Sequence, residues 1–223
     1  MNEELNAFQR LSDILDTLRR ECPWDRRQTL KSLRYLTIEE VHELSEAIVA
    51  LEDTTAADAS PAPNPPAAAL KKELGDLAMH ILFYCKIAAE RGLFSTADVY
   101  NTICDKLIDR HPFIYDRASY HGESWEQLKQ RESDHRGVLD GVPDTLPALV
   151  KAIRMQEKVA GKSAGRPDGD IGIASDGLLP DDATEDDLGD RLFALVDWAR
   201  RHGLNADDAL CAANSRFRRQ HSN

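Results

Sequence analysis

Apolar side chains recur at steps of three and four residues along most of the chain, which is the spacing of one face of an α-helix. In the first segment this face consists of Leu5, Phe8, Leu11, Leu15 and Leu18. We expect this helix to end near Cys22, because the residue before Pro23 avoids helical angles. No segment alternates polar and apolar residues for long enough to build a sheet. The pattern predicts an all-α protein.

The same spacing predicts helices at about 36–52, 67–91, 95–111, from 124 onward, 147–161, 188–203 and 205–217. Gly92 suits the left-handed position that closes the helix at 67–91. Ser95 and Asp98 form a capping-box pattern that begins the next helix. Residues 77–89 read LAMHILFYCKIAA, apolar on nearly every side, so this helix is expected at the centre of a bundle.

Two segments of different composition interrupt the helical pattern. Residues 53–69 are rich in proline and small residues and predict a loop, and residues 163–187 are rich in glycine and aspartate and predict an acidic linker. The helices at 188–223 echo those at 67–111, with a shared LGD, a glycine between the helices and a terminal histidine. An internal duplication is the simplest account of this similarity.

A formal charge of −11 over 223 residues makes a nucleic acid polymer an unfavourable partner. The four cysteines lie far apart without the spacing of zinc or redox motifs, so we expect reduced thiols. No secretory signal is recognised and no apolar run is long enough to cross a membrane. These features predict a cytoplasmic protein without a membrane partner.

Acidic residues occupy positions that the helical period directs inward. Glu40 and Glu43 lie on the helix at 36–52, and Glu73 and Asp76 lie three apart on the largely apolar helix at 67–91. We expect all four carboxylates to face the interior, and Lys71 and Lys72 to extend into water. Burying ionised carboxylates without compensation is costly, so a hard divalent cation with oxygen ligands, Mg²⁺ above all, is expected among them.

Several motifs occur together in one order. CPWD spans 22–25, EExxE contains Glu39, Glu40 and Glu43, ExxD contains Glu73 and Asp76, and DKLIDRHP spans 105–112. SWEQLK at 124–129 and VPDTLPALVKA at 142–152 follow. In this combination the chain resembles the MazG nucleotide pyrophosphohydrolases over nearly its whole length.

The resemblance implies a four-helix bundle formed by paired copies, and we expect a homodimer. It also implies hydrolysis of nucleoside triphosphates to monophosphate and pyrophosphate, clearing surplus or non-standard nucleotides, with Mg²⁺ as cofactor and Mn²⁺ as a substitute. The implied metal ligands are Glu40, Glu43, Glu73 and Asp76, with Glu39 supporting the cluster or acting on water. Lys106 and Arg110 would contact the phosphates, and Trp24 would contact the base or fill the core.

The resemblance also predicts the domain organisation. A MazG-like catalytic domain would span 1–120, followed by a helical connector at 121–162, the acidic linker at 163–187 and a degenerate second repeat at 188–223. The second repeat retains only Asp187 and Asp190 of the acidic motifs, so the first repeat is expected to be catalytic.

Two other interpretations stay open. Glu39 and His42 form ExxH, half of a di-iron carboxylate signature, which would suit a dimetal oxidase. A non-catalytic helical interaction module is the other. His80, one turn after Asp76, is either a positioning partner of that aspartate or a core histidine bonded to backbone.

Overall fold

The computed structural model describes residues 2–52, 65–118, 120–123, 128, 137–162, 179–180 and 182–221. All regular structure in these ranges is helical, which confirms the predicted all-α class. The chain forms two compact units, Met1–Arg117 and Ala118–Asn223, which are described separately below.

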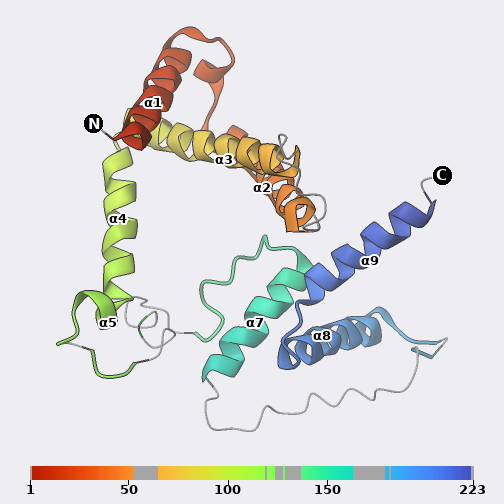
Figure 1. Ribbon diagram of the computed structural model, residues 1–223. Helices are drawn as coiled ribbons and strands as arrows, with labels where there is room; N and C mark the ends of the chain where they lie inside the picture. The colour runs from red at the N-terminus through yellow and green to blue at the C-terminus, as the bar shows by residue number, and fades with distance from the viewer. Residues whose placement is uncertain are drawn as a thin grey trace. The chain divides into compact units, whose positions relative to one another are not determined.

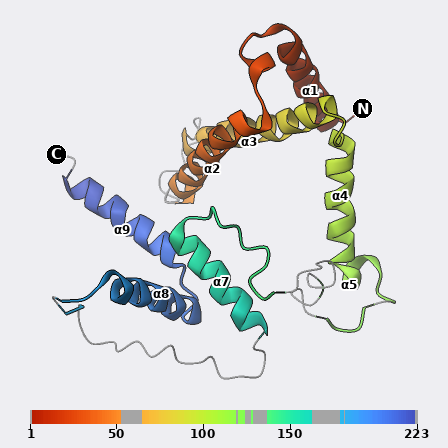
Figure 2. The ribbon, with the colours of Figure 1, turned by 180° about the vertical axis from the view of Figure 1, so that it is seen from behind.

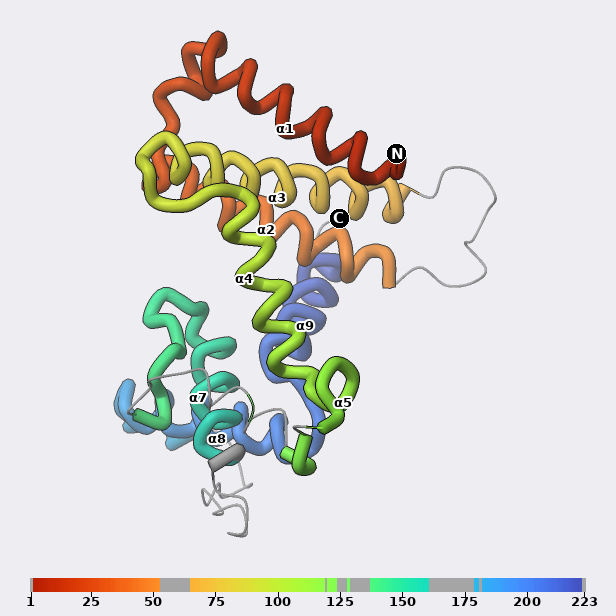
Figure 3. The backbone as a smooth tube through the Cα atoms, turned by 90° about the vertical axis from the view of Figure 1, so that its left-hand side faces the viewer, coloured from red at the N-terminus to blue at the C-terminus, as the bar shows by residue number. Residues whose placement is uncertain are grey.

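The first unit is built around one central helix. Its elements are α1 (Glu3–Glu21), the 3₁₀ turn η1 (Asp25–Arg27), α2 (Leu30–Glu52), α3 (Pro65–Glu90), α4 (Thr96–Asp109) and α5 (Pro112–Tyr115). α2 and α3 lie side by side, and α1 packs on α3 from the other side (Figures 1 and 3). The central position predicted for the apolar helix is confirmed.

The core of this unit joins α1, α2 and α3. It consists of Leu15, Leu33, Leu82, Phe83 and Ile87. An ion pair connects α1 to α3 beside this core. The Arg19 guanidinium donates two hydrogen bonds to Glu90, at 2.5 and 2.9 Å. The acidic groups of α2 and α3 lie beyond the other end of the core, so the packed half of the helix pair supports the half that carries the acids.

In the first unit, one helix begins well before its predicted position and one short helix is additional. α2 begins at Leu30 rather than near 36, because Thr29 and Ser32 bond to one another's backbone N–H groups and cap the helix. The short helix α5 was not predicted; Pro112 begins it. Of the helix expected from Ser124, only Leu128 is described, and it is helical. Residues 53–64 of the predicted loop lie outside the described residues, whereas 65–69 begin α3, so the loop prediction is wrong for these five residues.

The connection between α3 and α4 is a tight turn. Gly92 has φ of +65° and closes α3 as predicted, and the N–H of Leu93 donates to the carbonyl of Ala88 at 3.0 Å. Ser95 and Asp98 form the predicted capping box of α4. The turn sends α4 away from the C-terminal end of α3 at a steep angle (Figure 2).

The second unit contains α7 (Ala148–Lys162), α8 (Glu185–Arg201) and α9 (Ala206–His221). Gly203, with φ of +68°, joins α8 to α9 through the same kind of turn as Gly92, and the internal duplication stays a prediction. Buried Asp197 is held by Arg200 at 2.8 Å and by Arg201 at 3.0 Å. α8 begins three residues before the predicted position, and residues 163–178 of the proposed linker lie outside the described ranges.

Two general expectations can be compared with the structure. Cys22, Cys85, Cys104 and Cys211 are all free. Within the described part of the chain, no helix combines the length and the hydrophobicity that crossing a bilayer requires.

Candidate metal centre

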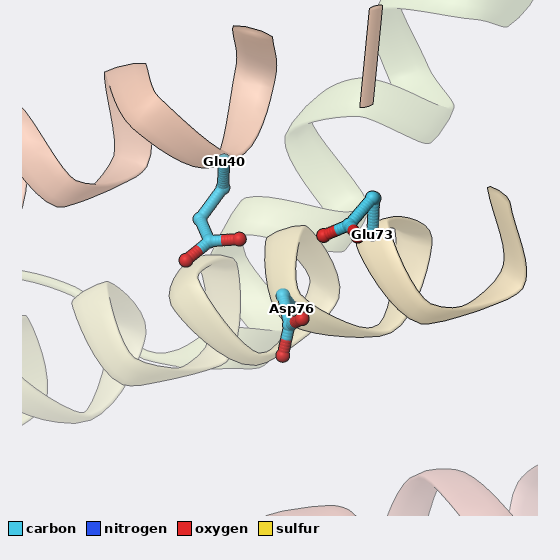
Figure 4. Close-up of side chains that lie close together, drawn as sticks. All are labelled: Glu40, Glu73 and Asp76. Atoms are coloured by element: carbon cyan, nitrogen blue, oxygen red, sulfur yellow. The ribbon is translucent and has the colours of Figure 1, made fainter. Parts of the chain in front are cut away.

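Three carboxylates from two helices converge in the first unit. Glu40 comes from α2, and Glu73 and Asp76 come from successive turns of α3 (Figure 4). One oxygen from each residue lies within 4.8 Å of the others. We call these three residues the acidic group. Their convergence follows from α2 and α3 lying side by side, with Glu73 and Asp76 on one face of α3.

The acidic group is partly withdrawn from water. Glu73 is only 7% exposed, and Glu40 and Asp76 are half-buried. Carboxylates kept this close in partial burial repel one another unless a positive charge lies among them. Oxygen-only donors at this spacing fit a hard divalent cation such as Mg²⁺ or Mn²⁺.

Lys72 supplies part of that positive charge. Its Nζ lies 3.0 Å from Glu73 Oε1 and 3.4 Å from Asp76 Oδ2. The hydrogen bonds to Glu73 and then to Asp76 raise the pKa of Lys72. The expectation that Lys72 extends free into water is therefore wrong, although its side chain is 64% exposed. Three carboxylates and one ammonium leave two negative charges, which is the charge that a divalent cation neutralises.

The pKa of Glu40 is raised above its ordinary value. Burial is the largest cause, followed by the negative charges of Asp76 and Glu43, whereas His80 acts in the opposite direction. Glu40 therefore holds a proton more readily than a free glutamate when no cation is present. A bound cation reverses this effect, because it favours the ionised carboxylate.

Glu43 and Glu39 do not join the acidic group. Both are exposed, so the expectation that four carboxylates face the interior is wrong for Glu43 in the single chain. The helical period explains the difference: Glu43 is rotated further from α3 than Glu40 is. Glu43 still lies near enough to raise the pKa of Glu40.

Behind the acidic group, His80 is buried between α2 and α3. Its Nδ1 lies 2.8 Å from Oγ1 of Thr37, so it bonds to a side chain rather than to backbone. The hydroxyl of Tyr84 lies 2.6 Å from the same oxygen. The sequence analysis did not predict a role for Thr37 or Tyr84. Thr37 lies one helical turn before Glu40, and Tyr84 lies one turn after His80.

Lys106 and Arg110 are not brought to the acidic group within one chain. Lys106 lies in the last turn of α4, and Arg110 is the residue that caps this helix. α4 begins after the C-terminal end of α3 (Figure 1). Asp76 lies fourteen residues before the end of α3 at Glu90, a helical distance of about 21 Å. Because α4 leaves α3 at a steep angle instead of running back along it, a lysine or arginine side chain at the far end of α4 does not reach the acidic group (Figures 1 and 2).

Trp24 lies at the beginning of η1 and is 50% exposed. It does not fill the core, so the core-filling alternative is wrong. Half of its surface is open to contact with another molecule, and contact with a nucleobase stays a prediction.

The second unit lacks an equivalent acidic group in its described residues. Asp187 accepts hydrogen bonds from the hydroxyl and the backbone N–H of Thr184, at 2.6 and 2.8 Å, in a capping box. These bonds lower the pKa of Asp187. The aspartate that corresponds to Glu73 therefore begins a helix instead of contributing to a cluster.

Together these features define a class of protein, namely an all-helical protein with a carboxylate site suited to a hard divalent cation. The acidic group contains no histidine within the described residues. This donor set does not resemble the Glu-x-x-His pairs of di-iron bundles, and both Glu39 and His42 are exposed.

Comparison with known proteins identifies the family of the chain. Residues 28–115 match the family model of the MazG nucleotide pyrophosphohydrolase domain. The chain is 32% identical over 240 residues to the nucleoside triphosphate pyrophosphohydrolase of Escherichia coli K12, covering 97% of this chain and 86% of that protein. It is also 32% identical over 231 residues to the nucleoside triphosphate pyrophosphohydrolase/pyrophosphatase MazG of Thermotoga maritima, covering 97% and 85%. The chain belongs to the MazG nucleotide pyrophosphohydrolase family, and the predicted resemblance is confirmed.

Proposed function

We propose that this protein hydrolyses nucleoside triphosphates to the monophosphate and pyrophosphate, with Mg²⁺ as cofactor and Mn²⁺ as a substitute, and that it removes surplus or non-standard nucleotides. The observation that carries the proposal is the convergence of Glu40, Glu73 and Asp76 within a domain of the MazG family. The acidic group and Lys72 together leave a charge that suits one divalent cation.

The side chains have separable parts in this proposal. Glu40, Glu73 and Asp76 hold the cation, and Glu43 joins them by a change of rotamer from its exposed position. A bound cation would neutralise triphosphate charge and lower the pKa of the attacking water. Glu39, exposed beside Glu40, accepts the proton of that water, a contribution of about 10²–10⁴-fold where general-base catalysis operates. Lys106 and Arg110 bind the phosphates, and Trp24 contacts the base.

We further propose that the active form is a homodimer in which a second chain supplies Lys106 and Arg110. Two observations support this. α4 begins about 21 Å along α3 from Asp76. In addition, α2 and α3 carry apolar side chains that are 43–51% exposed, and a second chain would cover them: Ile38, Val41, Ile48, Leu74 and Ile81.

The test is pyrophosphate release from a panel of ordinary, deoxy and damaged triphosphates in Mg²⁺. We expect Glu73→Gln and Asp76→Asn to lower turnover by at least about 10³-fold, since each removes a charge that holds the cation, while the helical content by circular dichroism persists. Glu46→Gln is the matched control, because Glu46 is an exposed glutamate of the same helix pair outside the acidic group. Unchanged turnover in both acidic-group variants would remove these residues from the metal site.

A further inference from the structure

Three polar side chains meet between α2 and α3 next to the acidic group. Oγ1 of Thr37 lies 2.8 Å from Nδ1 of His80 and 2.6 Å from the hydroxyl of Tyr84. The hydroxyl of Thr37 also donates to the carbonyl of Leu33, one turn back on α2, at 3.0 Å. We call Thr37, His80 and Tyr84 the threonine junction.

The bonding capacity of the threonine hydroxyl matches these contacts. A hydroxyl has one proton to donate and two lone pairs that accept. Donation to the carbonyl of Leu33 leaves both lone pairs for N–H of His80 and O–H of Tyr84, so one assignment satisfies all three distances. This assignment places a proton on Nδ1 of His80.

The junction lies one helical turn from the acids on both helices. Thr37 precedes Glu40 by three residues on α2, and His80 follows Asp76 by four residues on α3, so each pair shares a helix face. Glu40 is the member of the acidic group that comes from α2, and it reaches toward α3 from there (Figure 4). Its distance from Glu73 and Asp76 therefore depends on how α2 is held against α3.

We propose that the threonine junction positions the acidic group, by fixing the separation of α2 and α3 at which Glu40, Glu73 and Asp76 bind one divalent cation. The inference rests on the proposed metal site. Mg²⁺ requires near-octahedral ligands at about 2.0–2.1 Å, so a displacement of α2 by a fraction of an ångström weakens binding. The hydroxyl of Thr37 also satisfies buried His80, and its loss leaves that imidazole without a partner.

The experiment measures Mn²⁺ affinity without nucleotide, by electron paramagnetic resonance of the free ion. Thr37→Val keeps the shape of the side chain but removes the hydroxyl, and we expect its Mn²⁺ affinity to fall about tenfold or more, as for other groups that orient metal ligands. Thr37→Ser restores the hydroxyl and is expected to bind within about threefold of the unmodified chain. His80→Asn retains a donor near the position of Nδ1 and is expected to bind more tightly than His80→Leu.

A control separates positioning from loss of stability. Leu18→Ala weakens the packing of α1 against the core and leaves all three side chains of the junction in place. An equal loss of Mn²⁺ affinity in Leu18→Ala, or unchanged affinity in Thr37→Val, would overturn the proposal. A chain that binds Mn²⁺ but releases no pyrophosphate refutes the proposed function alone, and the Thr37 series then still decides the junction by its affinities.

Discussion

At the scale of single residues, the electrostatics of the acidic group depend on Glu40. Its pKa is raised by burial, by Asp76 and by Glu43. A carboxyl group whose pKa is higher in the folded than in the unfolded chain stabilises the fold at low pH. This contribution is lost as the pH rises through the folded pKa. Ionised Glu40 therefore destabilises the metal-free fold near neutral pH.

We expect Glu40→Gln to raise the thermal stability of the metal-free protein at pH 7, because the variant buries no charge there and does not repel Asp76. The difference should shrink toward pH 4.5, the ordinary pKa of a glutamate, where Glu40 gains its proton. Calorimetry in a chelating buffer measures both values. Adding Mg²⁺ should stabilise the unmodified chain more than the variant. A variant that is less stable than the unmodified chain at pH 7 without metal would contradict this account of Glu40.

The residues of the site differ in how far sequence predicts them. The helical period directs Glu40, Glu73 and Asp76 inward, since each choice depends only on neighbours within its own helix. The same period wrongly places exposed Glu43 inward, because it does not report how far the neighbouring helix extends around α2. Thr37 was missed because its partners, His80 and Tyr84, lie on the other helix. Lys72 was misplaced because a flexible side chain at the edge of a helix face can turn either to water or to a neighbouring acid.

At the scale of elements, capping chemistry sets the helix ends. The end at Gly92 and the capping box of Ser95 were predicted correctly, because both are short-range signals. The start of α2 was predicted six residues too late, since Thr29 and Ser32 bond reciprocally without the usual acidic residue in the first turn. The steep departure of α4 from α3 depends on packing between elements that periodicity does not report.

Substitution of glycine by alanine is expected to change stability in opposite directions at Gly92 and Gly75. A Cβ at either Gly92 or Gly75 meets nothing within 4 Å, so only the backbone decides the outcome. Gly92→Ala forces alanine to φ of +65° and should destabilise the fold by about 1–2 kcal/mol. Gly75→Ala lies inside α3 and should stabilise it by about 0.5–1 kcal/mol.

Chemical denaturation of the metal-free protein measures both differences in the free energy of unfolding. A loss of stability in Gly75→Ala would show that another part of the protein, such as a second chain, approaches α3 at this position. Equal stabilities of Gly92→Ala and the unmodified chain would contradict the left-handed turn.

At the scale of the whole molecule, the proposed active site needs more than one chain. The sequence places Lys106 and Arg110 in the first repeat with the acids, but it does not indicate that α4 leaves α3 about 21 Å from Asp76. A single sequence also carries no direct signal of which exposed apolar residues a second copy covers.

Mixed dimers test this arrangement. One chain carries Glu73→Gln, the other carries Lys106→Ala with Arg110→Ala, and each is inactive alone in the proposed scheme. Co-expression followed by purification through a different affinity tag on each chain isolates the mixed dimers, which should have about half of the normal turnover because each has one complete site of two. Turnover no higher than that of the separate variants would show that both sets of residues act within one chain, or that no dimer forms.

The position of Lys72 has a consequence for how the protein matures. Its ammonium already bridges Glu73 and Asp76 across one turn of α3. Part of the repulsion between these side chains is thus relieved by a group that is covalently attached and always present. We therefore expect the helices to form before a cation binds, unlike a zinc finger, whose folding waits for its metal. In the proposed scheme, binding of the divalent cation is then a late and reversible event.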